Sequence, residues 1–113
     1  MAISFNAIGQ AHVSFSAAES AQAGVCKLTE NGTVGACEAG DSFCGVVTEV
    51  RCGVAAVTMS GFVELPYSGE APAVGYQTLA ADGAGGVKTV TAGGRSLLVV
   101  MVDSANETVG VFL

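Results

Sequence analysis

The sequence predicts an all-β protein, a small antiparallel β-barrel or sandwich of about eight short strands with an extended N-terminal arm. Short apolar segments recur along most of the chain, at the spacing of about 8–12 residues that all-β domains show. Gly, Asn and Asp fall between these segments, and Gly alone makes up 16 of the 113 residues. A chain of this length allows one domain.

The N-terminal segment 1–22 differs from the rest of the chain. It combines Phe5, Ile8, His12 and Phe15 with Ser, Asn and Gln, and it contains no tight-turn signal. We expect an arm or an edge strand here, followed by a β-barrel domain over residues 23–113. The alternative is that the segment forms the first strand of the barrel. Its Ala-rich end has no apolar stripe at helical spacing, so we expect one or two helical turns at most.

The remaining strands are separated by recognisable turns. Asn31-Gly32 is a strong hairpin signal and predicts pairing of 25–29 with 33–37. The apolar run 97–102 is typical of a strand buried on both faces. The other expected strands cover 43–50, 54–59, 62–65, 76–80, 87–91 and 107–113.

Charge and hydropathy exclude several classes of partner. Four basic residues stand against ten acidic ones, for a net charge of −6, so we expect neither nucleic acid nor an anionic membrane surface as a partner. The longest apolar run is too short for a lipid bilayer, which requires about 20 residues. The first residues lack a basic region and a continuous apolar region, so we expect no secretion signal.

The four cysteines lie within one stretch of the sequence, at Cys26, Cys37, Cys44 and Cys52. No short Cys-x2–4-Cys pair occurs among them, and the only histidine, His12, lies outside the stretch. We therefore expect no metal site and no cofactor. We interpret the cysteines as reduced thiols that pack like small hydrophobic residues. A disulfide formed after release from a cell is the alternative.

No catalytic constellation is recognisable, and we expect a protein that is not an enzyme. A small enzyme would have to use His12, whose neighbours supply no nucleophile motif. Asp41, Asp82 and Asp103 occupy turn positions, where Asp caps its own backbone. The Gly-rich segment 83–86 lacks the lysine and the following helix of a phosphate-binding loop. Because charge is so sparse, we expect apolar surface patches that are covered in an oligomer or on a larger partner.

The order of turns and strands from residue 23 onward resembles a known family. This layout is similar to that of the small β-barrel decoration, or head-stabilising, proteins of tailed bacteriophages and prophages. The resemblance rests on turn glycines and strand spacing, and it includes neither the arm nor the four cysteines. The segments that carry it are 23–29, 40–47, 53–57, 61–66, 74–79, 82–88 and 109–113.

The resemblance implies a structural virion protein on the outer capsid surface, assembled in the cytoplasm of the bacterial host. It would stabilise the shell by binding across subunits of the major capsid protein, with a homotrimer as the favoured oligomer. Phe5, Ile8, His12 and Phe15 would then contact the capsid or a neighbouring copy, with the arm's main chain adding to a partner's sheet edge. The alternative function is a non-enzymatic β-sandwich module of a phage tail or of a host-surface, carbohydrate-binding adhesion component. Such modules display exposed aromatic platforms, and Trp is absent here.

Overall fold

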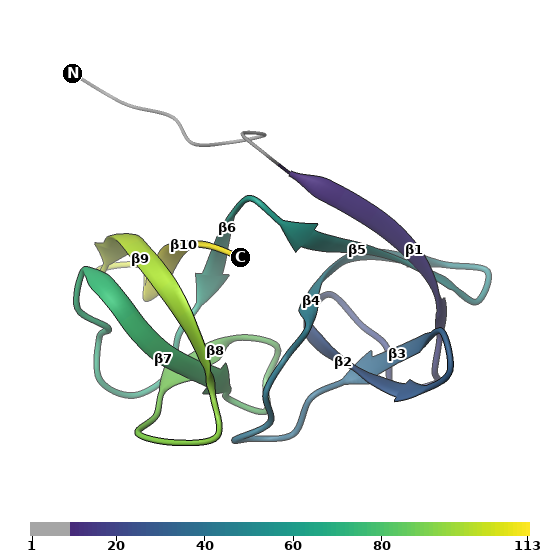
Figure 1. Ribbon diagram of the computed structural model, residues 1–113, viewed down its shortest axis with the longest axis horizontal. Coiled ribbons are helices and arrows are strands. Elements are labelled where there is room, and N and C mark those ends of the chain that lie inside the picture. Colours follow the sequence, from purple (N-terminus) through teal and green to yellow (C-terminus); the bar gives the residue numbers. More distant parts are fainter. Residues whose placement is uncertain (1–9) are drawn as a thin grey trace.

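The computed structural model describes residues 10–113, and in this range the chain forms ten strands and no helix (Figure 1). The predicted all-β class is confirmed. The first five strands are β1 (Ala11–Ala17), β2 (Gly24–Glu30), β3 (Thr33–Ala36), β4 (Gly45–Arg51) and β5 (Val54–Ser60). The last five are β6 (Phe62–Pro66), β7 (Gly75–Ala81), β8 (Val87–Thr89), β9 (Arg95–Asp103) and β10 (Thr108–Phe112).

The first five strands close into a barrel with the order β1-β3-β2-β4-β5. Strand β1 pairs antiparallel with β5 along its length, and it pairs in parallel with β3 only at Ser16 and Ala17. Residues 11–17 of the expected arm are thus a barrel strand, and residues 1–9 lie outside the described part of the chain. The Ala-rich segment after β1 forms one turn, closed by the amide of Ala21 donating to the carbonyl of Ala18 at 3.0 Å.

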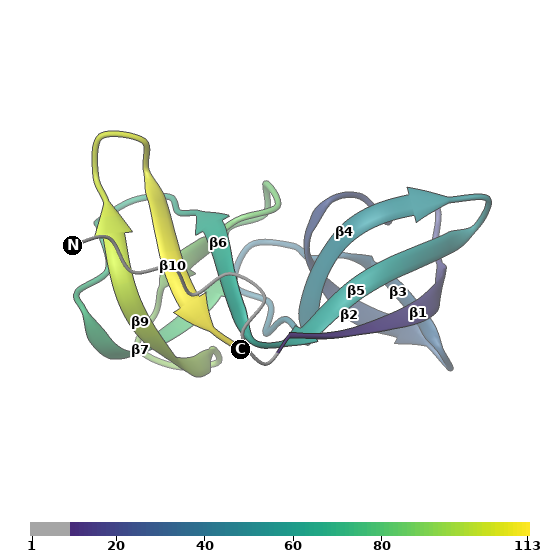
Figure 2. The same ribbon diagram turned by 90° about the horizontal axis from the view of Figure 1, so that it is seen from above.

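The last five strands form a second sheet with the order β6-β10-β9-β7-β8 (Figure 2). An isolated parallel bridge between Tyr67 and Val87 brings its two ends together. The expectation that 97–102 is buried on both faces is wrong. Leu97 and Val99 are buried, but Leu98 is half-buried and Met101 is exposed. The reason is that the large core cluster packs against only one face of the second sheet.

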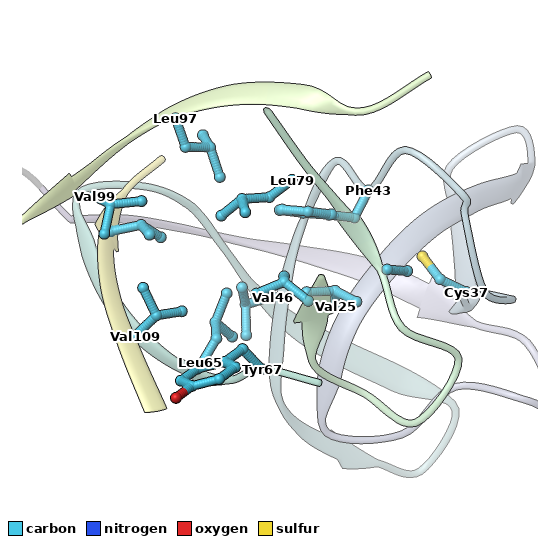
Figure 3. Close-up of a cluster of buried hydrophobic side chains, with 13 residues drawn as sticks. Val25, Cys37, Phe43, Val46, Leu65, Tyr67, Leu79, Leu97, Val99 and Val109 are labelled. Atoms are coloured by element: carbon cyan, nitrogen blue, oxygen red, sulfur yellow. The ribbon is translucent and has the colours of Figure 1, made fainter. Parts of the chain in front are cut away.

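The largest core cluster lies between the two halves of the chain and is shared by them (Figure 3). The barrel half supplies Val25, Cys37, Phe43 and Val46, and the remaining members come from strands β6 to β10 and the start of the loop after β6. A second cluster fills the barrel and contains only small side chains. Its buried members are Cys26, Val34, Val47, Ala55 and Val57.

Backbone hydrogen bonds join the two sheets directly. The amide of Gly40 donates to the carbonyl of Ala81 at 2.8 Å, the amide of Ala81 donates to the carbonyl of Asp41 at 2.9 Å, and the amide of Val25 donates to the carbonyl of Gly85 at 3.1 Å. The change from one sheet to the other falls at Gly61, between β5 and β6. Among residues 10–113, the structure contains no helix long and apolar enough to span a lipid bilayer.

Candidate interaction surfaces

The structure separates the residues that sequence analysis singled out for partner binding. Phe5 and Ile8 lie outside the described residues. Phe15 is half-buried and packs against the barrel core. His12 is exposed, and its Nδ1 lies 3.1 Å from Thr58 Oγ1. Because His12 pairs with Thr58 and Phe15 pairs with Ala55 on the same neighbouring strand, the two side chains point to opposite faces of β1.

The turn aspartates act on their own backbone. Asp82 Oδ1 accepts hydrogen bonds from the amides of Ala84 at 2.7 Å and Gly86 at 3.1 Å. Asp103 Oδ1 accepts from the amide of Ala105 at 3.0 Å, and its hydrogen bonds, that from the Asn106 side chain foremost, hold the pKa of this carboxyl below its usual value. These acids therefore stabilise turns, as their positions in the sequence predict.

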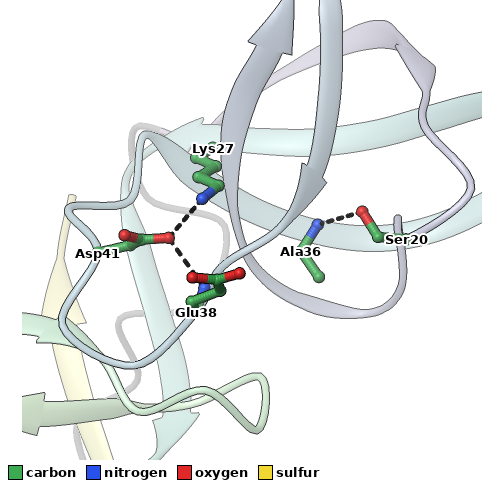
Figure 4. Close-up of polar contacts among 5 residues, drawn as sticks. All are labelled: Ser20, Lys27, Ala36, Glu38 and Asp41. Atoms are coloured by element: carbon green, nitrogen blue, oxygen red, sulfur yellow. Dashed lines mark hydrogen bonds and ion pairs between the residues drawn. The ribbon is translucent and has the colours of Figure 1, made fainter.

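Asp41 ties a turn to a neighbouring strand (Figure 4). Its Oδ2 accepts from Lys27 Nζ at 2.5 Å and from the amide of Glu38 at 2.9 Å. The Lys27 ammonium lowers the pKa of the Asp41 carboxyl, and the carboxylate raises the pKa of Lys27 in return. Because residues 40 and 41 also bond to β7, this contact helps to hold the two sheets together.

One group of exposed apolar side chains lies at the end of the barrel where two hairpins turn. The end of β1 joins these turns, because the amide of Ser16 donates to the carbonyl of Gly32 and the amide of Ala17 to that of Gly53, each at 2.9 Å. We call the group the barrel-end surface. Its members are Leu28, which is 56% exposed, Val50 and Val54. They share the place where the hairpins turn and not one strand face, because Val54 pairs with Arg51 and Val50 pairs with the core residue Ala55. Charges of both signs lie beside it, since Arg51 Nη2 is 3.2 Å from Glu49 Oε1.

A second group lies on the second sheet, on the face opposite the shared core. Strand register places Tyr76 beside Leu98 and Leu98 beside Phe112. Met101 lies on the same face, over Gly110. A Cβ added to Gly110 would lie 3.2 Å from Met101 Cγ and 2.7 Å from the Phe62 ring. We call the set the sheet-face surface; its members are Tyr76, Leu98, Met101 and Phe112, with Val74 at the edge. Tyr76 is 75% exposed and Val74 70%, the largest values among the described large apolar residues.

An open hollow of about 490 Å³ adjoins Met101 on the sheet-face surface. Glu64 and Asp103 both line it, and none of its lining residues is Lys or Arg. The hollow therefore carries acidic charge of one sign, and polar atoms line more of it than apolar atoms do. A partner that fits it offers a basic group to the acids and an apolar side chain to Met101.

The two surfaces lie at opposite ends of an elongated molecule. The described chain measures 40 × 30 × 22 Å, and both ribbon views place β7 and β9 at one end of the long axis and the β4–β5 turn at the other (Figures 1 and 2). Sequence analysis predicted exposed apolar patches but located neither one. No signal in the sequence marked Tyr76, because the buried residues of its strand are the consecutive Leu79, Ala80 and Ala81. Which face of the strand is exposed at Tyr76 depends on the sheet's partners.

Comparison with known proteins identifies no relative. No protein-family model matches the chain, and no curated protein matches it significantly. Within residues 10–113, no group of three or more His, Cys, Asp or Glu side chains is placed to hold a metal ion.

Proposed function

We propose that this protein is a non-enzymatic structural subunit of a phage virion that decorates and stabilises the outer capsid shell. Two features support the proposal. Its strand and turn order is similar to that of small β-barrel decoration proteins. Apart from Val13, its exposed large apolar residues fall into two separate groups, on strands that lie at opposite ends of the molecule (Figure 1), as a subunit that bridges two partners requires. The second observation carries the proposal, because a single-partner binder needs only one such surface.

The charges beside the two surfaces decide which partner each one contacts. The barrel-end surface has Arg51 and Glu49 beside it, so copies of the chain can meet there with opposite charges opposed. The sheet-face surface borders the hollow with Glu64 and Asp103, and two copies meeting there would bring acids against acids. We therefore assign the barrel end to contacts within a homotrimer and the sheet face to the major capsid protein.

Shell stabilisation follows from repetition of this arrangement. An exposed Tyr is a typical anchor of a protein interface, because it buries a large area at a low cost in conformational entropy. Each subunit adds one such contact, and a trimer presents three at once. Linked contacts bind far more tightly than one alone, so modest individual affinities can hold capsid subunits together.

The function is tested by co-sedimentation of the purified protein with undecorated capsids of its own phage, and by light scattering of the protein alone. We expect a discrete trimer that pellets with capsids. Val74→Ser should weaken capsid binding by about tenfold, as loss of one buried apolar side chain predicts, and Tyr76→Ser by more. The matched control is Val13→Ser, because Val13 is 44% exposed and belongs to neither surface.

The assignment of the two surfaces is tested by a charged substitution at the barrel end. Leu28→Glu should convert the trimer to a monomer and weaken capsid binding through lost multivalency. A wild-type monomer that does not pellet with capsids contradicts the proposed function. Equal binding by the Val74→Ser and Val13→Ser variants contradicts the assignment of the sheet face to the capsid.

The exposure of Tyr76 favours one second function, a carbohydrate-binding module of a phage tail or host-surface adhesion component. A Tyr ring 75% exposed offers a platform on which a sugar can stack. Glycan-array binding that is lost in the Tyr76→Ser variant, together with no affinity for capsids, would support this function in place of decoration.

A further inference from the structure

Two cysteines from neighbouring strands meet at the entrance to the barrel core. Cys26 lies on β2, and Cys44 immediately precedes β4. The amide of Cys44 donates to the carbonyl of Cys26 at 2.8 Å, and Cys26 pairs with Gly45 in the ladder. Cys44 is therefore one position from the residue directly opposite Cys26, on hydrogen-bonded backbones where the Cα separation of about 4.4–6.8 Å that a disulfide spans is within reach.

The side chains of these cysteines also meet. The thiol of Cys44 lies close enough to that of Cys26 to raise its pKa, after burial as the main cause, and Cys26 Sγ lies 3.5 Å from the carbonyl oxygen of Gly45. Both cysteines pack in the barrel cluster, where Cys26 is 1% exposed and Cys44 is half-buried. A bond between the two sulfurs therefore requires no rearrangement of the strands.

The other two cysteines are packed differently, although Cys37 lies near enough to Cys26 and Cys44 for the charges of these thiols to affect one another. Cys37 belongs to the shared core cluster, and burial raises the pKa of its thiol to about 11. Cys52 is exposed in the β4–β5 turn, at the opposite end of β4 from Cys44. Cys26 and Cys44 are therefore the pair whose main chains are hydrogen-bonded and whose side chains pack in the same cluster.

We propose that Cys26 and Cys44 form an intramolecular disulfide when the protein meets a small-molecule disulfide oxidant. Cys44 reacts first, because it is the more accessible of the two: its thiolate attacks one sulfur of the oxidant and expels one thiolate, which takes up a proton. The Cys26 sulfur then attacks Cys44 Sγ, the mixed disulfide breaks, and the second small thiol leaves with the Cys26 proton. Two protein thiols are oxidised and one disulfide is reduced to two thiols.

The second step is slow at neutral pH and faster in alkali. In the reduced protein burial, foremost, and the neighbouring Cys44 and Cys37 raise the pKa of the Cys26 thiol to about 12. Burial still acts on Cys26 in the mixed disulfide, and the thiolate is the reactive form. The bond joins β2 to the start of β4 and closes the loop between them, so it stabilises the barrel by restricting the unfolded chain. This inference concerns the barrel interior and does not depend on the proposed function.

The test uses the full-length reduced protein incubated with glutathione disulfide. Peptide mapping by mass spectrometry should find Cys26 linked to Cys44, with an intact mass lower by two hydrogens. The oxidised protein should unfold about 10 °C higher than the reduced one, the shift expected for a disulfide that closes a short loop. The rate of closure should rise with pH.

Two variants serve as controls. Cys44→Ser should acquire no intramolecular bond and show no increase in unfolding temperature, whereas Cys52→Ser should behave as the wild type. A stable glutathione adduct on Cys44, or a bond from Cys44 to Cys37 instead, would overturn the proposal. So would an oxidised wild-type protein that unfolds at the same temperature as the reduced one, a comparison that needs no variant to fold.

Discussion

The barrel of β1–β5 and the sheet of β6–β10 each contain five strands, yet they are stabilised differently. The largest buried side chains inside the barrel are Val, and Ala55 and Cys26 lie among them. The second sheet places Leu65, Leu79 and Leu97 in the shared cluster. A five-stranded barrel is narrow and has room only for small side chains. It therefore depends on its turns, and on the core that it shares with the second sheet, for much of its stability.

The largest effect is expected where the two halves touch. Gly24 has φ 125°, and an added Cβ would lie 2.6 Å from the carbonyl oxygen of Gly85. Gly24→Ala combines backbone strain with a clash between main chains and should cost about 4 kcal/mol of unfolding free energy. Urea denaturation measures this cost. Gly32→Ala is the control, because its φ is also positive but no atom lies within 4 Å, and it should cost about 1 kcal/mol. Equal costs would contradict the close approach.

A pair of core truncations tests the difference between the two interiors. Leu79 and Val57 are both fully buried, in the shared cluster and the barrel cluster respectively. Leu79→Ala should cost about 3 kcal/mol and Val57→Ala about 2 kcal/mol, because the larger side chain leaves the larger cavity. Both values come from urea denaturation monitored by circular dichroism. A greater loss for Val57→Ala would mean that the barrel, not the shared core, dominates stability.

The β4–β5 turn offers a gain in stability within the barrel. Cys52 has φ 51° and Gly53 has φ 77°, the type I′ geometry that Asn-Gly adopts most readily. Cys52→Asn should raise the unfolding free energy by about 0.5–1 kcal/mol by relieving left-handed strain. Cys52→Ala keeps that strain and should leave stability unchanged. No gain for the Asn variant would show that the turn contributes little to the barrel.

The smallest effect is expected at the surface contact of Asp41 with Lys27. Asp41→Asn should lower the thermal midpoint slightly at neutral pH, because the ion pair is lost. The folded-state pKa of Asp41 lies below its usual value. The ion pair therefore stabilises the folded protein fully above about pH 4, and this stabilisation is lost as the pH falls through the lowered pKa. Thermal melts across a pH series should therefore show wild type and variant converging in acid. Glu70→Gln is the control, because Glu70 is exposed and takes no part in an ion pair of the described residues. A difference that persists in acid would contradict the ion pair of Asp41.

Local chemistry explains why the strand segments could be predicted. Asn31-Gly32 and the Asp turns act on their own backbone, so their effect does not depend on distant residues. The candidate surfaces could not be located in this way, because Tyr76 is exposed only as a consequence of which face the sheet presents to its core.

The sequence by itself determined the all-β class, the turns and the approximate extent of the strands, because these depend on residues close together in the chain. Tertiary structure alone decided that β1 closes a barrel with β5, that 97–102 has one exposed face, and that Cys26 meets Cys44. Each of these outcomes joins segments far apart in sequence. Strand composition predicts only that a segment will pair with another strand. Which strand it pairs with depends on how much apolar surface the whole chain buries in that arrangement.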